Sequence, residues 1–257
     1  MTDKEYRAAE GVNKSTLWLM HKSPAHYLWF SEHQREDTQA LRLGRAIHSA
    51  ILTPDSFAGD WAVLPEEIDR RTKAGKEAYA EFEASSAGRE ILTAAEAEQV
   101  RNIAEAVLSS VDTSELLNLA RIREEPIFWT DRETGLLCKC RVDAMSIEQR
   151  VLIDLKTTTD ADTLSFYREA ARYGYDVQAA HYSSGFFEKF GHWPDWYFIA
   201  VEKAEPFAAH VFRADDSWLD QGEAVRRDLL AKLKHCRESG EFPGYDLSIL
   251  YGREESL

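Results

Sequence analysis

The chain has 257 residues, enough for one large domain with a substantial core, and its 44% hydrophobic content is ordinary for a globular protein. Its formal net charge of −14 argues against a protein that coats nucleic acid with its whole surface, because phosphate binding needs local positive charge. A nuclease stays compatible with this charge, since it can confine positive potential to one channel and bound metal ions supply more.

Targeting signals and cysteines indicate the cellular compartment in which the protein is expected. No apolar run approaches the roughly 18 to 20 residues that a membrane-spanning helix needs, so no membrane partner is expected. Residues 1–10 are polar and acidic and lack the apolar core of a secretory signal. The three cysteines cannot all pair with one another, and we expect a reduced, cytoplasmic setting.

The first 120 residues are predicted to be mainly helical, because apolar residues recur at helical spacing between capping signals. Ser15 is the predicted N-cap of the first helix, and Pro24 opens the next one. The helical patterns cover residues 16–21, the segment from Pro24, residues 43–52 before Pro54, and residues 93–110, with a charged, alanine-rich stretch over 66–90.

From about residue 124 the pattern changes to strands and helices. Strands are expected at 126–130, 136–145, 151–155, 196–202 and 207–213, and helices at 161–172, 176–190 and 216–238. This order predicts an α/β fold with a central mixed sheet. Because no repeat and no long linker interrupts the chain, we expect a single domain over 1–257.

The candidate chemistry lies in the pattern Asp143, ten residues, Asp154-Leu155-Lys156. Asp154 and Lys156 share one face of a strand while Leu155 faces the core, and a turn after the preceding strand brings Asp143 toward Asp154. Two close carboxylates repel each other unless a cation lies between them, and hard oxygen ligands favour Mg²⁺ or Mn²⁺. A neighbouring lysine can activate water and stabilise charge on a phosphate.

The alternative is that these side chains are simply solvated, since an Asp and a Lys two apart on an edge strand are common. Asp154, however, interrupts the apolar run Val151–Leu155. A carboxylate in a buried strand costs stability unless it is paired or binds a metal. The run therefore favours a functional site.

Further segments resemble the PD-(D/E)xK nuclease superfamily, specifically its RecB-like branch. Gly44–His48 resembles the branch's G-x-x-x-H helix, Gln178–Tyr182 resembles its Q-x-x-x-Y motif, and residues 15–27 resemble its N-terminal helical signature. Within the branch, the chain is most similar to the RecE-like (exodeoxyribonuclease VIII) nuclease domains. That similarity rests on five ordered segments: LGRAIHSAILTP, RRTKAGK, TGLLCKCRVDA, IDLKTTTDA and YDVQAAHYSSG.

This resemblance implies a restriction-endonuclease-like core, a central mixed β-sheet flanked by helices, with an added N-terminal helical region. The mainly helical part, 1–120, carries His48, and the sheet core, 121–257, carries the catalytic lysine, Lys156. The implied metal ligands are His48, Asp143, Asp154 and the carbonyl of Leu155. Glu124 is implied to assist these ligands or to hold a second metal, while Glu125 points the other way. Gln178 and Tyr182 are implied to support the site and contact the DNA strand.

Two groups of residues are candidate DNA contacts, and the sequence allows two roles for each. Arg70, Arg71, Lys73 and Lys76 form the densest basic cluster, which is either a solvated face or part of a DNA channel. The hydroxyls of Thr157 and Thr158 either bind phosphate or cap the helix that begins near Ala161.

The resemblance implies an exonuclease that acts on double-stranded DNA with a free end and depends on Mg²⁺, with Mn²⁺ as the alternative ion. It implies processive 5′→3′ digestion, leaving 3′ single strands for homologous recombination with a RecT-like single-strand annealing partner. A homotetrameric ring is expected, as is a stand-alone catalytic unit of phage type, because RecE carries a long N-terminal region that this chain lacks. The alternatives are a structure-specific or single-strand nuclease of the same superfamily, and a catalytically inactive DNA-binding scaffold.

Overall fold

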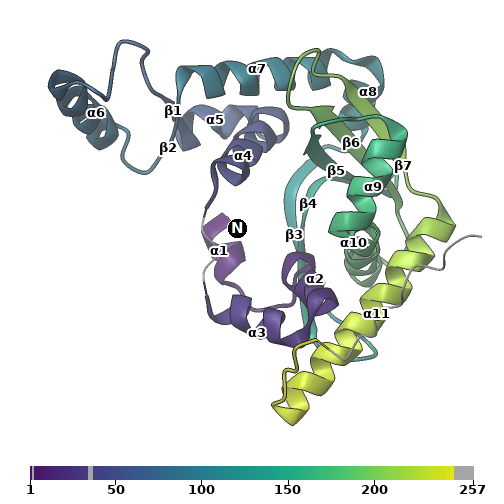
Figure 1. The fold of residues 1–257 in the computed structure, drawn as a ribbon. Coiled ribbons are helices and arrows are strands. Elements are labelled where there is room, and N and C mark those ends of the chain that lie inside the picture. The colour runs from purple at the N-terminus through teal and green to yellow at the C-terminus, as the bar shows by residue number, and fades with distance from the viewer. Residues whose placement is uncertain (2, 34–36, 246–257) are drawn as a thin grey trace, which may run out of the picture.

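A five-stranded mixed sheet forms the centre of the computed structural model, which describes residues 1, 3–33 and 37–245 (Figure 1). The strand order is β3-β4-β5-β6-β7, with β5 and β6 parallel and the other neighbours antiparallel. The strands are β3 (Ile122–Thr130), β4 (Leu137–Ser146), β5 (Val151–Thr158), β6 (Asp195–Glu202) and β7 (Ala209–Arg213). The predicted α/β fold with a central mixed sheet is confirmed.

Helices cover both faces of this sheet and enclose two hydrophobic clusters. On one face pack α2 (Lys14–Lys22), α9 (Thr163–Tyr173), α10 (Tyr175–Phe190) and α11 (Asp216–Ser239), and on the other α4 (Gln39–Leu52), α7 (Ala94–Ser109) and α8 (Val111–Leu119). Alternate residues of β5 enter opposite clusters: Leu152 lies in the α10 cluster, whereas Ile153 and Leu155 lie in the α4 cluster. This burial on both faces explains the apolar run of β5.

The N-terminal region contains one small sheet that the sequence pattern did not indicate. Strands β1 (Trp61–Val63) and β2 (Glu90–Leu92) pair in parallel and bracket α6 (Lys73–Ser85). Each strand is too short to show an alternation of polar and apolar residues. Figure 1 shows α6 at the edge of the molecule, far from β4 and β5. The remaining helices are α1 (Asp3–Ala8), α3 (Pro24–Glu32) and α5 (Pro54–Asp60).

Helix starts follow local capping chemistry, with one correction. The predicted N-cap Ser15 is wrong, because Asn13 caps α2 by accepting a hydrogen bond from the Thr16 amide at 2.9 Å. Asparagine is as strong an N-cap as serine, and it comes first in the chain. Pro24 opens α3 as predicted, behind the N-cap Ser23.

Strand β3 begins before the predicted residue and passes through Pro126. Proline lacks an amide hydrogen and is tolerated here because β3 is an edge strand of the sheet. Among the described residues, no helix is long and apolar enough to cross a membrane.

Candidate active site

The candidate site lies where β4 and β5 part from each other. The two strands pair from Ala144 opposite Ile153 as far as Ser146 opposite Val151, and they separate at Asp143 and Asp154. In the gap, Asp143 Oδ2 accepts a hydrogen bond from the Leu155 amide at 2.8 Å. Since the N–H and C=O of one strand residue lie on the same edge, the Leu155 carbonyl faces this gap as well.

Strand β3 is distorted at the same level. Glu124 falls opposite Asp143 in the register of β3 and β4, but the two residues form no bridge, and Glu124 has φ of 50°. A non-glycine residue in this region is strained, and such strain is often concentrated at functional sites. The alternation of β4 also breaks here, because Val142 packs in the α10 cluster and Ala144 in the α4 cluster. The irregular backbone presents Glu124 and Asp143 together.

His48, Glu124 and Asp143 form a potential metal-binding group, with one ligand atom from each within 4.8 Å of the others. His48 projects from α4, and its Nδ1 lies 3.5 Å from Asp143 Oδ2. Glu124 Oε2 also pairs with Arg141 Nε at 2.8 Å. Carboxylate oxygens with one imidazole suit a divalent ion such as Mg²⁺ or Mn²⁺. Glu125 points away and pairs with Lys189 at 2.9 Å.

Asp154, Lys156 and Gln178 form a second group on the α10 side of β5. Lys156 Nζ lies 2.5 Å from Asp154 Oδ2, an ion pair without an aligned hydrogen bond to that oxygen. Gln178 joins both residues: its Oε1 accepts from Lys156 Nζ at 3.1 Å, and its Nε2 donates to Asp154 Oδ1. As residues two apart on a strand, Asp154 and Lys156 share one face. The amide of Gln178 fixes both side chains.

The electrostatics of Asp154 favour a cation. Its side chain is 3% exposed, and burial raises the pKa of its carboxyl above the ordinary value, with the charge of Asp143 acting in the same direction. The ammonium of Lys156 and the imidazole of His48 oppose this rise in pKa without overcoming it. A divalent ion between the carboxylates would supply the missing positive charge. The residues present therefore fit a metal site.

We expect divalent metal to stabilise the protein more at a pH above the raised pKa of Asp154 than at a pH below it. The raised pKa of Asp154 means that its ionised form destabilises the metal-free protein as pH rises through that pKa. Metal binds this ionised form, so protons compete with it at the lower pH. Melting temperatures with Mg²⁺ and with EDTA at both pH values measure the effect. In Asp154→Asn the Mg²⁺-induced rise should shrink; an equal rise in the variant would contradict the assignment.

Tyr182 lies one helical turn after Gln178 on α10. Its ring packs edge-on against Trp196 at 5.7 Å between centroids. Burial raises the pKa of its hydroxyl well above the ordinary value, and the carboxylates of Asp154 and Asp143 add to that rise. The hydroxyl is therefore neutral and lies near enough to Asp154 and Asp143 for their charges to affect it. Its contact with a DNA strand stays a prediction.

The two threonines after the lysine lie in different surroundings. Thr158 is buried, and its hydroxyl donates to Glu169 Oε2 at 2.8 Å. The N-cap of α9 is Asp162, so neither threonine caps that helix. Thr157 is half-buried at the end of β5. Internal hydrogen bonding thus occupies Thr158, and a phosphate contact by Thr157 stays a prediction.

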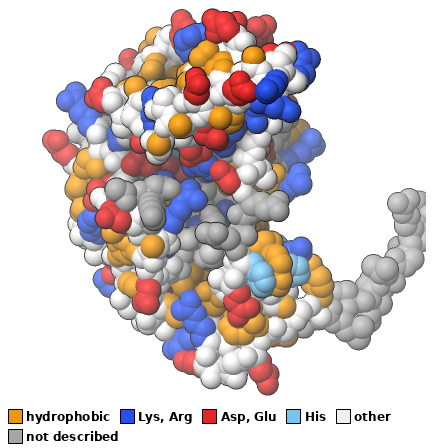
Figure 2. Space-filling view, turned by 90° about the vertical axis from the view of Figure 1, so that its left-hand side faces the viewer, with side chains coloured by type: hydrophobic (Ala, Val, Ile, Leu, Met, Phe, Trp, Pro, Cys, Tyr) orange, Lys and Arg blue, Asp and Glu red, His pale blue; other side chains and the backbone are white. Residues whose placement is uncertain are grey.

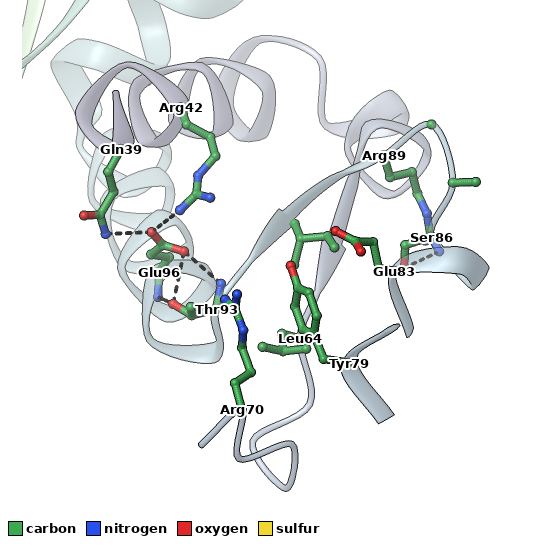
Figure 3. A pocket seen from close by; sticks show the side chains of 13 residues that line it. Gln39, Arg42, Leu64, Arg70, Tyr79, Glu83, Ser86, Arg89, Thr93 and Glu96 are labelled. Atoms are coloured by element: carbon green, nitrogen blue, oxygen red, sulfur yellow. Dashed lines mark hydrogen bonds and ion pairs between the residues drawn. The ribbon is translucent and has the colours of Figure 1, made fainter. Parts of the chain in front are cut away.

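The predicted basic cluster is distant from the carboxylates. Arg70 lies 4.1 Å over the ring of Tyr79, at a pocket of about 490 Å³ between α4, α6 and α7 (Figure 3). Arg71 pairs with Asp69 and Lys73 lies 4.0 Å from Glu77, while Lys76 is exposed on α6. On the face in Figure 2, basic and acidic side chains are interspersed without a continuous basic strip. The structure does not join this cluster to the active site, and its DNA contact stays a prediction.

Sequence reasoning missed one charged neighbour of the site, Lys14. This lysine is 8% exposed and electrostatically coupled to both Lys156 and Asp154. A weak signal was present, because Lys14 lies one turn before the apolar residues Leu17 and Trp18 on the same helix. The position of the Lys14 ammonium near Lys156 and Asp154 depends on how α2 packs against α9 and α10.

One family model and one solved structure agree with this fold. Residues 14–253 match the model of a PDDEXK-like domain of unknown function (DUF3799). A solved structure from Eubacterium rectale, described as a candidate exonuclease, has a TM-score of 0.63 at 14% identity, covering 96% of each chain. A phage-related exonuclease from Haemophilus somnus has a TM-score of 0.36 at 13% identity, covering 76% of this chain and 94% of that one. No curated protein matches significantly.

The match to the family model confirms the superfamily that the sequence motifs predicted. The match includes His48, Glu124, both aspartates, Lys156 and the α10 motif, since all lie within residues 14–253. At 14% identity, the similarity to the Eubacterium rectale structure supports the fold alone. The finer resemblance to RecE-like domains stays a prediction.

Proposed function

Because the chain belongs to the family of PDDEXK-like domains (DUF3799), we propose that it is a divalent-metal-dependent DNA exonuclease. The observation that supports this most is the convergence of four elements on one gap in the sheet. Helix α4 supplies His48, β4 supplies Asp143, β5 supplies Asp154 and Lys156, and α10 supplies Gln178. This is the donor set and the lysine that phosphodiester hydrolysis needs.

Each side chain of the site has a separate role in the proposed hydrolysis. His48, Asp143 and Glu124 would hold the ion, and the Leu155 backbone lies at the same gap. The charges of Asp143 and His48 act on the nearby carboxylate of Asp154. The ion would supply Lewis-acid stabilisation of negative charge on phosphate oxygens. Lys156 orients the attacking water and stabilises charge that develops on the phosphate. Gln178 holds the ammonium of Lys156 against Asp154, which keeps the lysine in its working position.

The finer features of this proposal come from the sequence resemblance to RecE-like domains. They are the use of Mg²⁺, digestion of double-stranded DNA from a free end in the 5′→3′ direction, and processivity. They also include a homotetrameric ring and a RecT-like annealing partner that receives the 3′ single strand. Contacts to the phosphate backbone suffice for digestion without sequence preference.

We expect linear duplex DNA to be degraded in the presence of Mg²⁺, while the same DNA as a covalently closed circle survives. An exonuclease needs an end, and the site needs its ion. Label placed at the 5′ end or the 3′ end of the linear form reports polarity, and EDTA is the control for metal. Cutting of the closed circle would identify an endonuclease instead, and preference for single strands would identify the single-strand alternative. Absence of any cutting would favour the inactive scaffold.

A further inference from the structure

The buried lysine Lys14 lies beside the active site but has no role in the proposed hydrolysis. Its Nζ donates to the carbonyl of Tyr173 at 2.5 Å. Tyr173 ends α9, so this bond also satisfies a helix C-terminal carbonyl. An ammonium has three donors, and within the described ranges no other acceptor is hydrogen-bonded to this one. Two donors of a buried charge are thus left for a ligand.

Lys14 and Lys156 lie around the same aromatic ring. Lys156 Nζ is 4.7 Å from the centre of the Tyr175 ring, and Lys14 Nζ is 5.7 Å from it. The two ammonium groups are therefore at most 10.4 Å apart, the sum of these distances. This pair of positive charges is next to Asp154, whose carboxylate already pairs with Lys156. Lys14 adds positive charge that no protein side chain in the described structure pairs with.

The position of Lys14 is fixed by a close approach of two helices. Gly174 joins α9 to α10 with φ of 64°, and a Cβ there would lie 2.7 Å from the ring of Trp18. Trp18 lies one turn after Lys14 on α2, and the ammonium of Lys14 is 5.5 Å from its ring centre. Helix α2 therefore docks tightly on the corner before Tyr175. Lys14 is held beside the site and is not a mobile surface lysine.

Burial lowers the pKa of Lys14 to about 7, with repulsion from Lys156 acting in the same direction. Asp154 and Asp176 oppose this shift by attraction. A buried ammonium that has no carboxylate partner among the described residues destabilises the fold unless an anion neutralises it. An anion with several acceptor oxygens, such as a phosphate, would satisfy both the charge and the two remaining donors.

We propose that Lys14 binds a backbone phosphate of the DNA strand that is cut, beside the phosphate that faces Lys156. This inference rests on the proposed function. It assigns Lys14 a positioning role, because its ammonium would anchor the strand while Lys156 and the metal ligands act on the scissile bond.

The experiment compares the wild type with Lys14→Met, Lys14→Arg and Lys22→Met, using a short labelled linear DNA in EDTA, so that binding is measured without cutting. Lys22 is exposed on the same helix and is the matched control. Loss of one charged hydrogen-bonded contact should weaken binding by Lys14→Met about tenfold or more. The slope of log affinity against log salt should fall by roughly 0.7 to 0.9. Lys14→Arg should restore much of the DNA affinity and of the salt slope. Lys22→Met should leave the affinity and the slope unchanged.

The pH dependence of DNA affinity distinguishes phosphate binding from a purely structural role, because a structural role would leave it unchanged. The advantage of the wild type over Lys14→Met should be largest below about pH 7 and should decline above it, as the amine loses its proton. If Lys14→Met changes the melting temperature but leaves affinity, salt slope and pH profile unchanged, Lys14 only caps α9 and the proposal is overturned. Lys14→Gln replaces the methionine variant if the latter does not fold.

Failure of this inference is distinct from failure of the proposed function. Wild-type protein that binds DNA in EDTA but does not cut it with Mg²⁺ would overturn the nuclease activity. Cutting by the wild type with unchanged DNA binding by Lys14→Met would overturn only the role of Lys14. Wild-type protein that neither binds DNA in EDTA nor cuts it with Mg²⁺ would overturn both.

Discussion

Lys156→Met should lower the rate of Mg²⁺-dependent nucleotide release from linear duplex DNA by about 10³-fold. Methionine keeps the length of the side chain but removes the ammonium that lies 2.5 Å from Asp154 and 3.1 Å from Gln178. Without it, the attacking water and the charge on the phosphate lose their positive partner. The side chain of Lys156 is 18% exposed, so methionine fits at the edge of the site without opening a cavity.

The matched control is Lys232→Met, which changes a lysine that is 56% exposed on α11 and that, within the described ranges, pairs with Asp228 of its own helix. Its rate should equal that of the wild type. Rates are measured from single-turnover digestion of end-labelled DNA, with melting curves to show that each variant is folded. A Lys156→Met rate within about fivefold of the wild type would remove Lys156 from the chemistry.

Gly222→Ala should lower the free energy of unfolding by about 3 kcal/mol and the melting temperature by roughly 6 to 12 °C. Gly222 lies in α11 against the first turn of α10, and a Cβ there would lie 2.2 Å from the Asp176 carbonyl oxygen and 2.4 Å from its carbon. These are backbone atoms and cannot rotate away. The helices must separate, and α10 is the helix that holds Gln178 against Lys156.

The control for this change is Gly59→Ala in α5, where a Cβ would meet no atom of the described residues within 4 Å beyond its own stretch of helix. Because alanine is a better helix former than glycine, this variant should be unchanged or more stable by roughly 0.5 to 1 kcal/mol. Thermal and urea unfolding of both variants measure the difference. Equal melting temperatures for Gly222→Ala and the wild type would show that the two helices do not approach this closely.

Several features of the fold could be predicted because they are local. The period of two in Val151–Thr158 places Asp154 and Lys156 on one face whatever the rest of the chain does. The capping box at Thr93 and Glu96 defines the start of α7 in the same way. The Gln178 and Tyr182 pair shares a helix face because the residues are one turn apart. Each pattern involves residues within a few positions of one another.

The sequence by itself therefore determined the strand that carries the acid and the lysine, the helices around it and, through ordered motifs, the superfamily. The tertiary structure alone decided that β4 and β5 part at Asp143 and that a strained Glu124 joins His48 there. It also decided that the ammonium groups of Lys14 and Lys156 lie near the same ring, that of Tyr175. Those placements depend on strand register and on helices packed from distant parts of the chain. No local periodicity encodes them, because the distance between remote residues is fixed only when the whole core closes.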